Sequence, residues 1–146
     1  MSSLAERDIG PGLMSANLDL VRSIYAGWER RDFSRADWAH PEIQLVAPDG
    51  PAAGSWTGVS AMRDSWREWL SAWENWRVEA EEYRVLEDGS VLVLVHQSGR
   101  GKTSRIEIGR APGGHATLFQ FRDGTVDRLV LYADRNRALA DLGLNE

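Results

Sequence analysis

The stretch HATLFQFRDGTVDRLVLYADRNRALADLGL, from His115 to Leu144, decides the fold of this chain. Asp123-Gly124 stands between two runs rich in β-branched and aromatic residues. This is the strongest short-range signal for a β-hairpin, because both turn residues must accept a positive φ angle. With these two residues as the turn, counting back along both strands predicts one face made of the pairs Phe121/Val126, Phe119/Arg128, Thr117/Val130 and His115/Tyr132.

The opposite face of the predicted hairpin carries Leu118, Leu129 and Leu131, since side chains alternate along a strand. Both faces are largely apolar, so both should be covered. The helices of the chain can cover one face, and a second copy of the chain can cover the other. We therefore expect a homodimer through the outer face of the sheet.

Size and composition fit a single globular domain. The chain has 146 residues, of which 42% are hydrophobic and 27% charged, so global disorder is not expected. The net charge of −5 without a basic cluster argues against nucleic acid or an anionic membrane as a partner. No apolar run is long enough to span a membrane and no signal peptide is recognisable, so we expect a cytoplasmic protein. Cysteine is absent, which excludes thiolate chemistry.

The elements before the hairpin follow from periodicity and turn residues. Residues 1–14 lack an apolar period and read as a flexible arm, which leaves 15–146 as the domain. If Asp88-Gly89 forms a second tight turn, Tyr83 pairs with Leu94 and Glu81 with His96. The expected elements are a helix from Ser15 or Asn17 to about Arg31, a short helix from Ser34 through Trp38, a strand over Glu42–Ala47, a helix from Val59 to about Trp73, strands over Trp76–Glu87 and Ser90–Gly101, a polar connection with room for a short strand at Arg105–Ile108, the hairpin, and a helix from Arg135 to Leu142 that Gly143 ends.

This order predicts an α+β fold. We expect a strongly curved, mostly antiparallel sheet wrapped as a conical barrel around the N-terminal helices, with a C-terminal helix beside it. Such a cone leaves a pocket suited to a small hydrophobic molecule.

With these elements in place, the chain resembles the SnoaL-like polyketide cyclase group of the nuclear transport factor 2-like (ketosteroid isomerase-like) superfamily. The resemblance covers roughly residues 16–144. It is carried by the acidic turn at Asp32 before His40-Pro41, by Trp56-Thr57-Gly58-Val59 before a Trp-rich helix, and by the ending Phe121–Val126, Tyr132-Ala133-Asp134 and Ala138-Leu139. The cystatin-like fold of that group hosts several chemistries, so the resemblance implies a fold more strongly than a reaction.

The resemblance also implies candidate catalytic residues. In the cyclases an Asp near the end of the last strand acts as the base, with a His on the preceding strand. The Asp position falls on Asp134 here, whereas the His position falls on Thr117 and His115 lies two residues earlier. An imidazole and a carboxylate at one end of a cone could move a proton next to a carbonyl group.

Each catalytic candidate has a structural alternative. Asp134 precedes the last helix, where a carboxylate caps backbone N–H groups. His115 follows two glycines and can be the exposed start of a strand, with Tyr132 as its predicted cross-strand neighbour. His96 interrupts an apolar strand, which fits either a pocket lining or a core histidine paired with Glu81.

The substrate-binding candidates are mostly aromatic: Tyr25, Trp28, Trp66, Thr117, Phe119 and Tyr132. Tyr25 and Trp28 lie on one helical stripe, and Trp66 lies on the stripe of the Trp-rich helix, so core packing is the alternative for all three. Flat rings in a pocket wall would favour aromatic or polycyclic ligands.

No metal-ligand spacing joins the three histidines, and no glycine-rich phosphate loop follows a strand, so we expect no cofactor and no metal. Two functions remain open. One is a cofactor-independent cyclase or isomerase acting by acid–base chemistry on a small carbonyl compound, with an epoxide hydrolase or dehydratase as a variant. The other is a non-catalytic ligand-binding or dimerisation module of the same fold.

Overall fold

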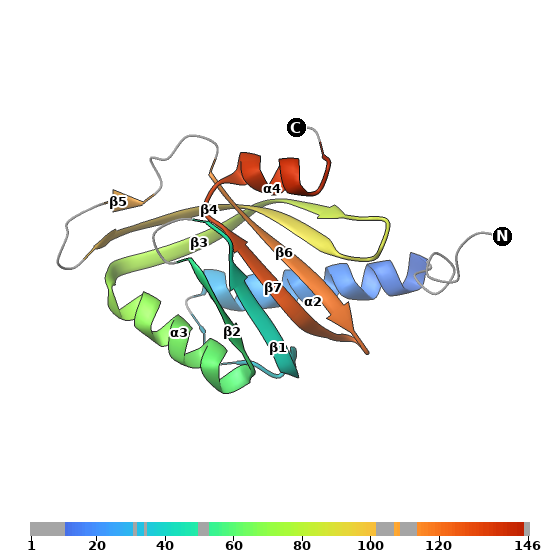
Figure 1. The fold of residues 1–146 in the computed structure, drawn as a ribbon, viewed down its shortest axis with the longest axis horizontal. Helices are drawn as coiled ribbons and strands as arrows, with labels where there is room; N and C mark the ends of the chain where they lie inside the picture. Colours follow the sequence, from blue (N-terminus) through green and yellow to red (C-terminus); the bar gives the residue numbers. More distant parts are fainter. Residues whose placement is uncertain are drawn as a thin grey trace.

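The structure, a computed structural model, describes residues 11–30, 32–33, 35–49, 53–101, 107–108 and 114–144. Its elements are α2 (Pro11–Glu29), β1 (Ala39–Ala47), β2 (Gly54–Thr57), α3 (Val59–Ser71), β3 (Trp73–Val85), β4 (Val91–Gly101), β5 (Glu107–Ile108), β6 (His115–Arg122), β7 (Thr125–Tyr132) and α4 (Arg135–Asp141). The strands form one curved sheet in the order β2-β1-β7-β6-β4-β3, and β5 pairs with β4. Helices α2 and α3 lie on one side of this sheet and α4 on the other (Figure 1).

The predicted α+β class is confirmed, with a mostly antiparallel sheet that curves but stays open instead of closing into a barrel. Only β1 with β7 is a parallel pair among the described strands. Strand β4 is buried on both faces, because α2 covers the side of Val91, Val93 and Val95 while α4 covers the side of Leu92 and Leu94. That position explains why its sequence is a continuous apolar run.

Helix α2 begins at Pro11, earlier than the predicted start at Ser15. Proline is favoured in the first turn of a helix, where its missing N–H would have no partner. Residues 11–14 therefore belong to the helix, and the rest of the predicted arm lies outside the described residues. The predicted apolar stripe of this helix is buried, and it consists of Val21, Ile24, Tyr25 and Trp28.

The predicted short helix ending at Trp38 is wrong, because its described residues form a turn. The indole N–H of Trp38 donates to the carbonyl of Arg35 over 3.1 Å, and the N–H of Ala39 donates to Ala36 over 3.1 Å. Ser34 lies outside the described residues. Strand β2 was not predicted. It is a four-residue, largely exposed edge strand, so no alternation of apolar residues marks it in the sequence.

The hairpin turn at Asp123-Gly124 is confirmed, with φ angles of 53° and 79°. Arg122 pairs with Thr125 and Phe121 with Val126 as predicted, but a β-bulge then places Asp127 outside the ladder. From Gln120↔Arg128 onward, each residue of β6 pairs one position later along β7 than predicted. Because side chains alternate along a strand, this displacement turns the side chains of β7 to the face of the sheet opposite the predicted one. The predicted pair of His115 with Tyr132 is therefore wrong, because Ala116 faces Tyr132.

The bulge also divides the set of leucines that was predicted to form a partner surface. Leu129 packs in the inner core with Phe119, whereas Leu118 packs on the outer side with Val130 beneath α4. Both leucines are buried within the chain, at 0% and 4% exposure. Together with Leu131, they cannot form one exposed patch, so the predicted surface is wrong and the homodimer stays a prediction.

The turn between β3 and β4 is longer than predicted. The N–H of Leu86 donates to the carbonyl of Ser90 over 2.8 Å, and the first ladder pair is Val85↔Val91. Tyr83 consequently faces Val93 rather than Leu94. A second irregularity between Ala80 and Glu82 leaves Glu81 outside the ladder, and His96 faces Glu79.

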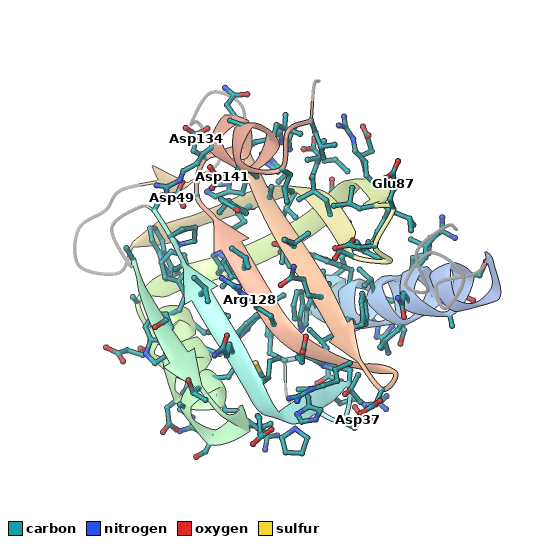
Figure 2. All side chains as sticks on the ribbon, turned by 45° about the vertical axis from the view of Figure 1, so that its right-hand side comes forward. Asp37, Asp49, Glu87, Arg128, Asp134 and Asp141 are labelled. Carbon is teal, nitrogen blue, oxygen red and sulfur yellow. The ribbon has the colours of Figure 1, made fainter. Side chains whose placement is uncertain are left out.

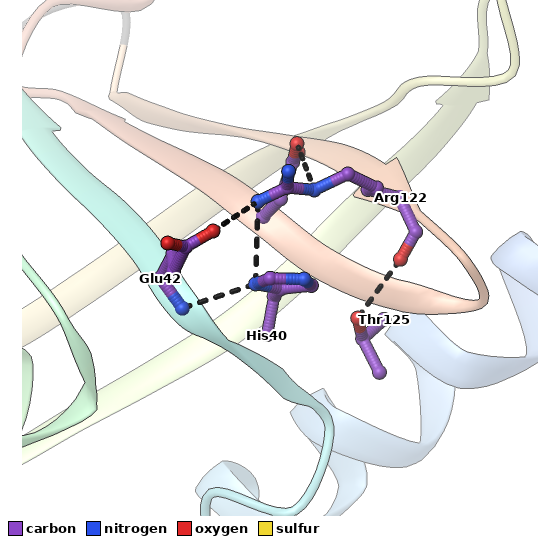
Figure 3. A network of polar contacts seen from close by, with 5 residues as sticks. His40, Glu42, Arg122 and Thr125 are labelled. Carbon is purple, nitrogen blue, oxygen red and sulfur yellow. Dashed lines mark hydrogen bonds and ion pairs between the residues drawn. The ribbon is translucent and has the colours of Figure 1, made fainter.

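A polar network ties the hairpin tip to β1 (Figure 3). Arg122 donates to Nδ1 of His40 and to a carboxylate oxygen of Glu42, each over 3.3 Å, and its Nε lies 3.6 Å from Asp127. The N–H of Glu42 also donates to Nδ1 of His40, over 3.0 Å. Since Nδ1 accepts from two donors, the imidazole carries its proton on Nε2. The bulged residue Asp127 thus helps to hold the parallel pair β1–β7 together.

Candidate functional site

A cavity of about 440 Å³ opens between the end of α2, Phe33 with residues 35–38, and α3. A volume of this size fits the usual range of small-molecule sites, on the order of 300–1,000 Å³. Helices α2 and α3 place their apolar stripes toward the concave side of the sheet, and the turn before β1 completes the wall. The lining consists of Trp28, Phe33, Arg35, Ala36, Trp38, Met62, Arg63, Trp66, Arg67 and Leu70.

Trp28 is the centre of the aromatic wall. Its ring centroid lies 5.0 Å from that of Trp66 in a tilted arrangement and 6.0 Å from that of Trp38 in an edge-to-face arrangement. Two of the sequence-predicted binding residues, Trp28 and Trp66, therefore meet at this cavity. Sequence reasoning missed Trp38 and Phe33, which lie in a segment without periodicity.

Tyr25, Phe119 and Thr117 lie behind this wall, in the core. Tyr25 and Phe119 are fully buried, with ring centroids 5.8 Å apart. The phenol of Tyr25 forms a hydrogen bond with the Thr117 side chain. Burial strongly raises the pKa of this phenol, and the bond to Thr117 only partly offsets the effect. The structure does not bring these three predicted binding residues to the cavity surface.

Tyr132, also predicted to bind substrate, lies on the outer side of the sheet beneath α4. Its hydroxyl donates to the Asp141 carboxylate over 3.4 Å. Burial raises the pKa of Tyr132, and the negative charge of Asp141 raises it further. The bulge in β7 is the reason that Tyr132 faces away from the cavity.

Asp134 caps α4, as its structural alternative predicted. Its side chain is exposed and accepts a hydrogen bond from the N–H of Asn136 over 3.0 Å. Asp49 supports the same corner by accepting from the N–H groups of Ala133 and Asp134, over 2.8 and 3.1 Å. Figure 2 shows Asp134 and Asp49 together, at the opposite end of the sheet from Asp37, whose neighbours Ala36 and Trp38 line the cavity.

Arg135 organises the surroundings of His115. Its guanidinium donates to the carbonyls of His115 and Val95, over 3.3 and 3.2 Å, and pairs with the carboxylate of Glu81. His115 is half-buried, whereas His96 on the neighbouring strand is exposed. The three catalytic candidates thus lie at one end of the sheet, but two of them, Asp134 and His96, face solvent.

The pKa of His115 is lowered. Burial is the largest cause, because it disfavours the charged imidazolium. The neighbouring Arg135 guanidinium and the His96 imidazole lower the pKa of His115 further, and the carboxylate of Asp49 opposes them. His115 is therefore neutral at pH 7 and able to accept a proton.

Two indole N–H groups are buried without a protein partner among the described residues, those of Trp73 and Trp76. The Trp76 ring packs against Phe33, a lining residue, at 5.5 Å between centroids. A buried donor without a partner costs about 1–3 kcal/mol. An acceptor oxygen that reached either N–H would remove this cost.

The charged residues that line the cavity are Arg35, Arg63 and Arg67. The described lining contains neither a carboxylate nor an imidazole. Among the described residues, no group of three or more His, Asp or Glu side chains could hold a metal ion. The cavity therefore offers a ligand aromatic surface and positively charged groups.

No helix in the described ranges is long and apolar enough to cross a bilayer.

Comparison with known proteins supports the fold. Residues 21–129 match the family model of the SnoaL-like domain. No curated protein sequence matches the chain. Structural neighbours are numerous, and three are informative.

An NTF2-like protein from Burkholderia pseudomallei superposes with a TM-score of 0.69 at 17% identity, covering 86% of this chain and 95% of its own. TerC, co-crystallised with polyporic acid, gives a TM-score of 0.66 at 20% identity over 87% of this chain and 97% of its own. A protein from Catenulispora acidiphila with a ketosteroid isomerase-like fold, in complex with trimethylamine, gives 0.63 at 17% identity over 87% and 94%. At these identities the likeness concerns the fold.

Proposed function

We propose that this chain, which belongs to the SnoaL-like domain family, binds a small planar hydrophobic molecule in the cavity between α2 and α3. The observation that carries the proposal is the wall of the cavity. Three indole rings, those of Trp28, Trp38 and Trp66, meet there around a volume of about 440 Å³. Aromatic faces give a large contact area to flat ligands, which favours rings over flexible chains.

Binding without catalysis is the function that this cavity supports best. Acid–base chemistry on a carbonyl compound needs a group that accepts a proton within hydrogen-bond reach of the ligand. The described lining holds no Asp, Glu or His side chain. Asp134, the base implied by the family resemblance, is committed to the cap of α4 at the other end of the sheet. The cyclase, isomerase, epoxide hydrolase and dehydratase alternatives therefore have less support.

Two structural neighbours agree with a ligand-binding role for the scaffold. TerC was co-crystallised with polyporic acid, and the protein from Catenulispora acidiphila was obtained in complex with trimethylamine. Polyporic acid and trimethylamine are ligands of those two proteins and not of this chain. They support the inference that the shared fold leaves room for a small molecule.

The proposal can be tested with a neutral fluorescent aromatic probe, N-phenylnaphthylamine, whose emission rises in an apolar site. We expect saturable binding of one molecule per chain. Ala36→Phe places a ring in the cavity from a half-buried turn position and should abolish binding. Ala140→Phe, at an exposed position of α4, is the matched control and should bind as the wild type does.

Native mass spectrometry of freshly purified protein adds a ligand-independent test. A retained small molecule that is absent from Ala36→Phe would support the cavity as the site. Unchanged probe affinity in an Ala36→Phe variant that keeps the wild-type circular dichroism spectrum would refute the proposal.

A further inference from the structure

The charged side chains in the described lining of the cavity are all arginines, although the chain as a whole is acidic. Arg35, Arg63 and Arg67 belong to the lining, whereas the complete sequence has 22 acidic and 17 basic residues. The lining itself therefore carries positive charge, while the carboxylates that pair with Arg35 and Arg67 lie outside it. A local field of that sign attracts anions and disfavours cations.

The three arginines come from both sides of the cavity. Arg63 and Arg67 are four residues apart on α3, so they lie on the same helical face one turn apart. Arg35 belongs to the turn between α2 and β1. The side chains of Arg35 and Arg67 are 71% and 77% exposed, which places their guanidinium groups at the mouth and leaves the buried rings as the floor.

Among the described residues, two of these arginines pair with local, exposed carboxylates. Arg35 pairs with Asp37 over 3.0 Å, and Arg67 pairs with Asp64 over 3.3 Å. The hydrogen bond from Arg35 lowers the pKa of the Asp37 carboxyl. Ion pairs this exposed are weak, so a ligand anion can compete with them for the guanidinium groups.

We propose that the ligand of this cavity is a planar aromatic anion, such as an aryl carboxylate, whose rings lie against Trp28 and Trp66 and whose anionic group binds between Arg35, Arg63 and Arg67. This inference rests on the proposed function and names its ligand class. Guanidinium groups suit the anion because their planar array of donors matches the two oxygens of a carboxylate. They also stack on aromatic faces, so the arginines can contact the rings as well as the charge.

The test compares a matched pair of ligands, naphthoate and naphthamide of the same ring isomer, by displacement of N-phenylnaphthylamine. The two have nearly the same shape, and only naphthoate is charged at neutral pH. At low salt, about 20 mM, we expect naphthoate to bind roughly tenfold more tightly, since each exposed pair contributes about two- to fivefold. The difference should shrink at about 500 mM salt, because salt screens exposed charges.

Variants assign the preference to the arginines. The double variant Arg63→Gln/Arg67→Gln should lose most of the naphthoate preference, so that its affinities for naphthoate and naphthamide become nearly equal. Arg128→Gln, at an exposed position on the outer face of β7, is the matched control and should leave both affinities unchanged (Figure 2). Asp64→Asn removes a competing carboxylate and should tighten naphthoate binding about twofold without a change for naphthamide.

The outcomes separate the two proposals. Equal affinities for naphthoate and naphthamide in the wild type, with the neutral probe still bound, would overturn the anion inference and leave the cavity as the binding site. A naphthoate preference that survives the double arginine substitution would overturn the assignment to Arg63 and Arg67. Absence of binding for all three molecules would overturn both proposals.

Discussion

Replacing Asp134 distinguishes a helix cap from a catalytic base. The carboxylate accepts the N–H of Asn136 over 3.0 Å and is exposed, and α4 is only seven residues long. That short helix nevertheless covers the outer core with Ala138 and Leu139, which are 0% and 4% exposed. Asp134→Ala should therefore lower the free energy of unfolding by about 1 kcal/mol, with 2 kcal/mol as a rough upper value for loss of a cap. In a chain of this length, about 1 kcal/mol corresponds to a fall in Tm of about 3–5 °C.

Asp134→Asn is the informative partner of this substitution. Asparagine caps about as well as aspartate, so its cost should stay within a few tenths of a kcal/mol, apart from the lost charge at the helix terminus. Thermal and urea unfolding measure both variants, and displacement of N-phenylnaphthylamine measures the cavity. We expect wild-type ligand binding in both. The cap assignment is refuted if Asp134→Ala leaves stability unchanged, or if Asp134→Asn destabilises the fold as much as Asp134→Ala.

Three further predictions concern the core and the backbone. Tyr25→Phe removes a buried hydroxyl and leaves Thr117 without its partner, so urea unfolding should show a loss of about 1–2 kcal/mol. The pKa of His115 is lower in the folded chain than in the unfolded one, so the unfolded state binds more protons and stability should fall as pH drops below about 6.5. His115→Gln should remove that part of the loss when unfolding is compared at about pH 7.5 and pH 5. Gly114→Ala should destabilise more than Gly124→Ala in thermal unfolding. Both have positive φ, but a Cβ at Gly114 would lie 2.8 Å from a guanidinium nitrogen and 3.3 Å from a backbone oxygen, whereas a Cβ at Gly124 meets nothing within 4 Å.

Local signals predicted the fold well. The Asp123-Gly124 turn needs two residues that accept positive φ, and the chain offers this pair at the right place. The apolar stripe of α2 and the continuous apolar run of β4 indicated burial on one and two faces, as the structure shows. The cap at Asp134 is also a local feature, and the structural alternative for this residue was right for that reason.

The bulge at Asp127 could not be predicted from pattern alone. The run after it, Arg128 to Tyr132, contains three consecutive apolar residues, so either register of β7 buries an apolar set on each face. Cross-strand packing decides between the two, since Leu129 fits beside Phe119 and Tyr132 fits beneath α4. The displacement by one residue removed the predicted cluster of His115 with Tyr132 and the predicted leucine patch.

Only some of the residues that line the cavity could be predicted from the sequence. Trp28 and Trp66 lie on helical stripes, so they were candidates for a pocket wall. Phe33 and Trp38 reach the cavity from a non-periodic segment, whose path depends on tertiary contacts. Arg63 lies beside the apolar stripe of α3, so its sequence position suggests a solvated helix face. It lines the cavity only because Arg35, Ala36 and Trp38 form the facing wall.

The central claim is that the ligand occupies the tryptophan-lined cavity, and NMR of the indole N–H groups tests it most directly. The chain has seven tryptophans, of which Trp28, Trp38 and Trp66 line the cavity. On titration with naphthoate, we expect the indole signals of these three tryptophans to shift, while the backbone amide signals of Ala133 and Asp134 stay in place. Shifts confined to the Asp134 end of the sheet, with the three indole signals unchanged, would contradict the claim.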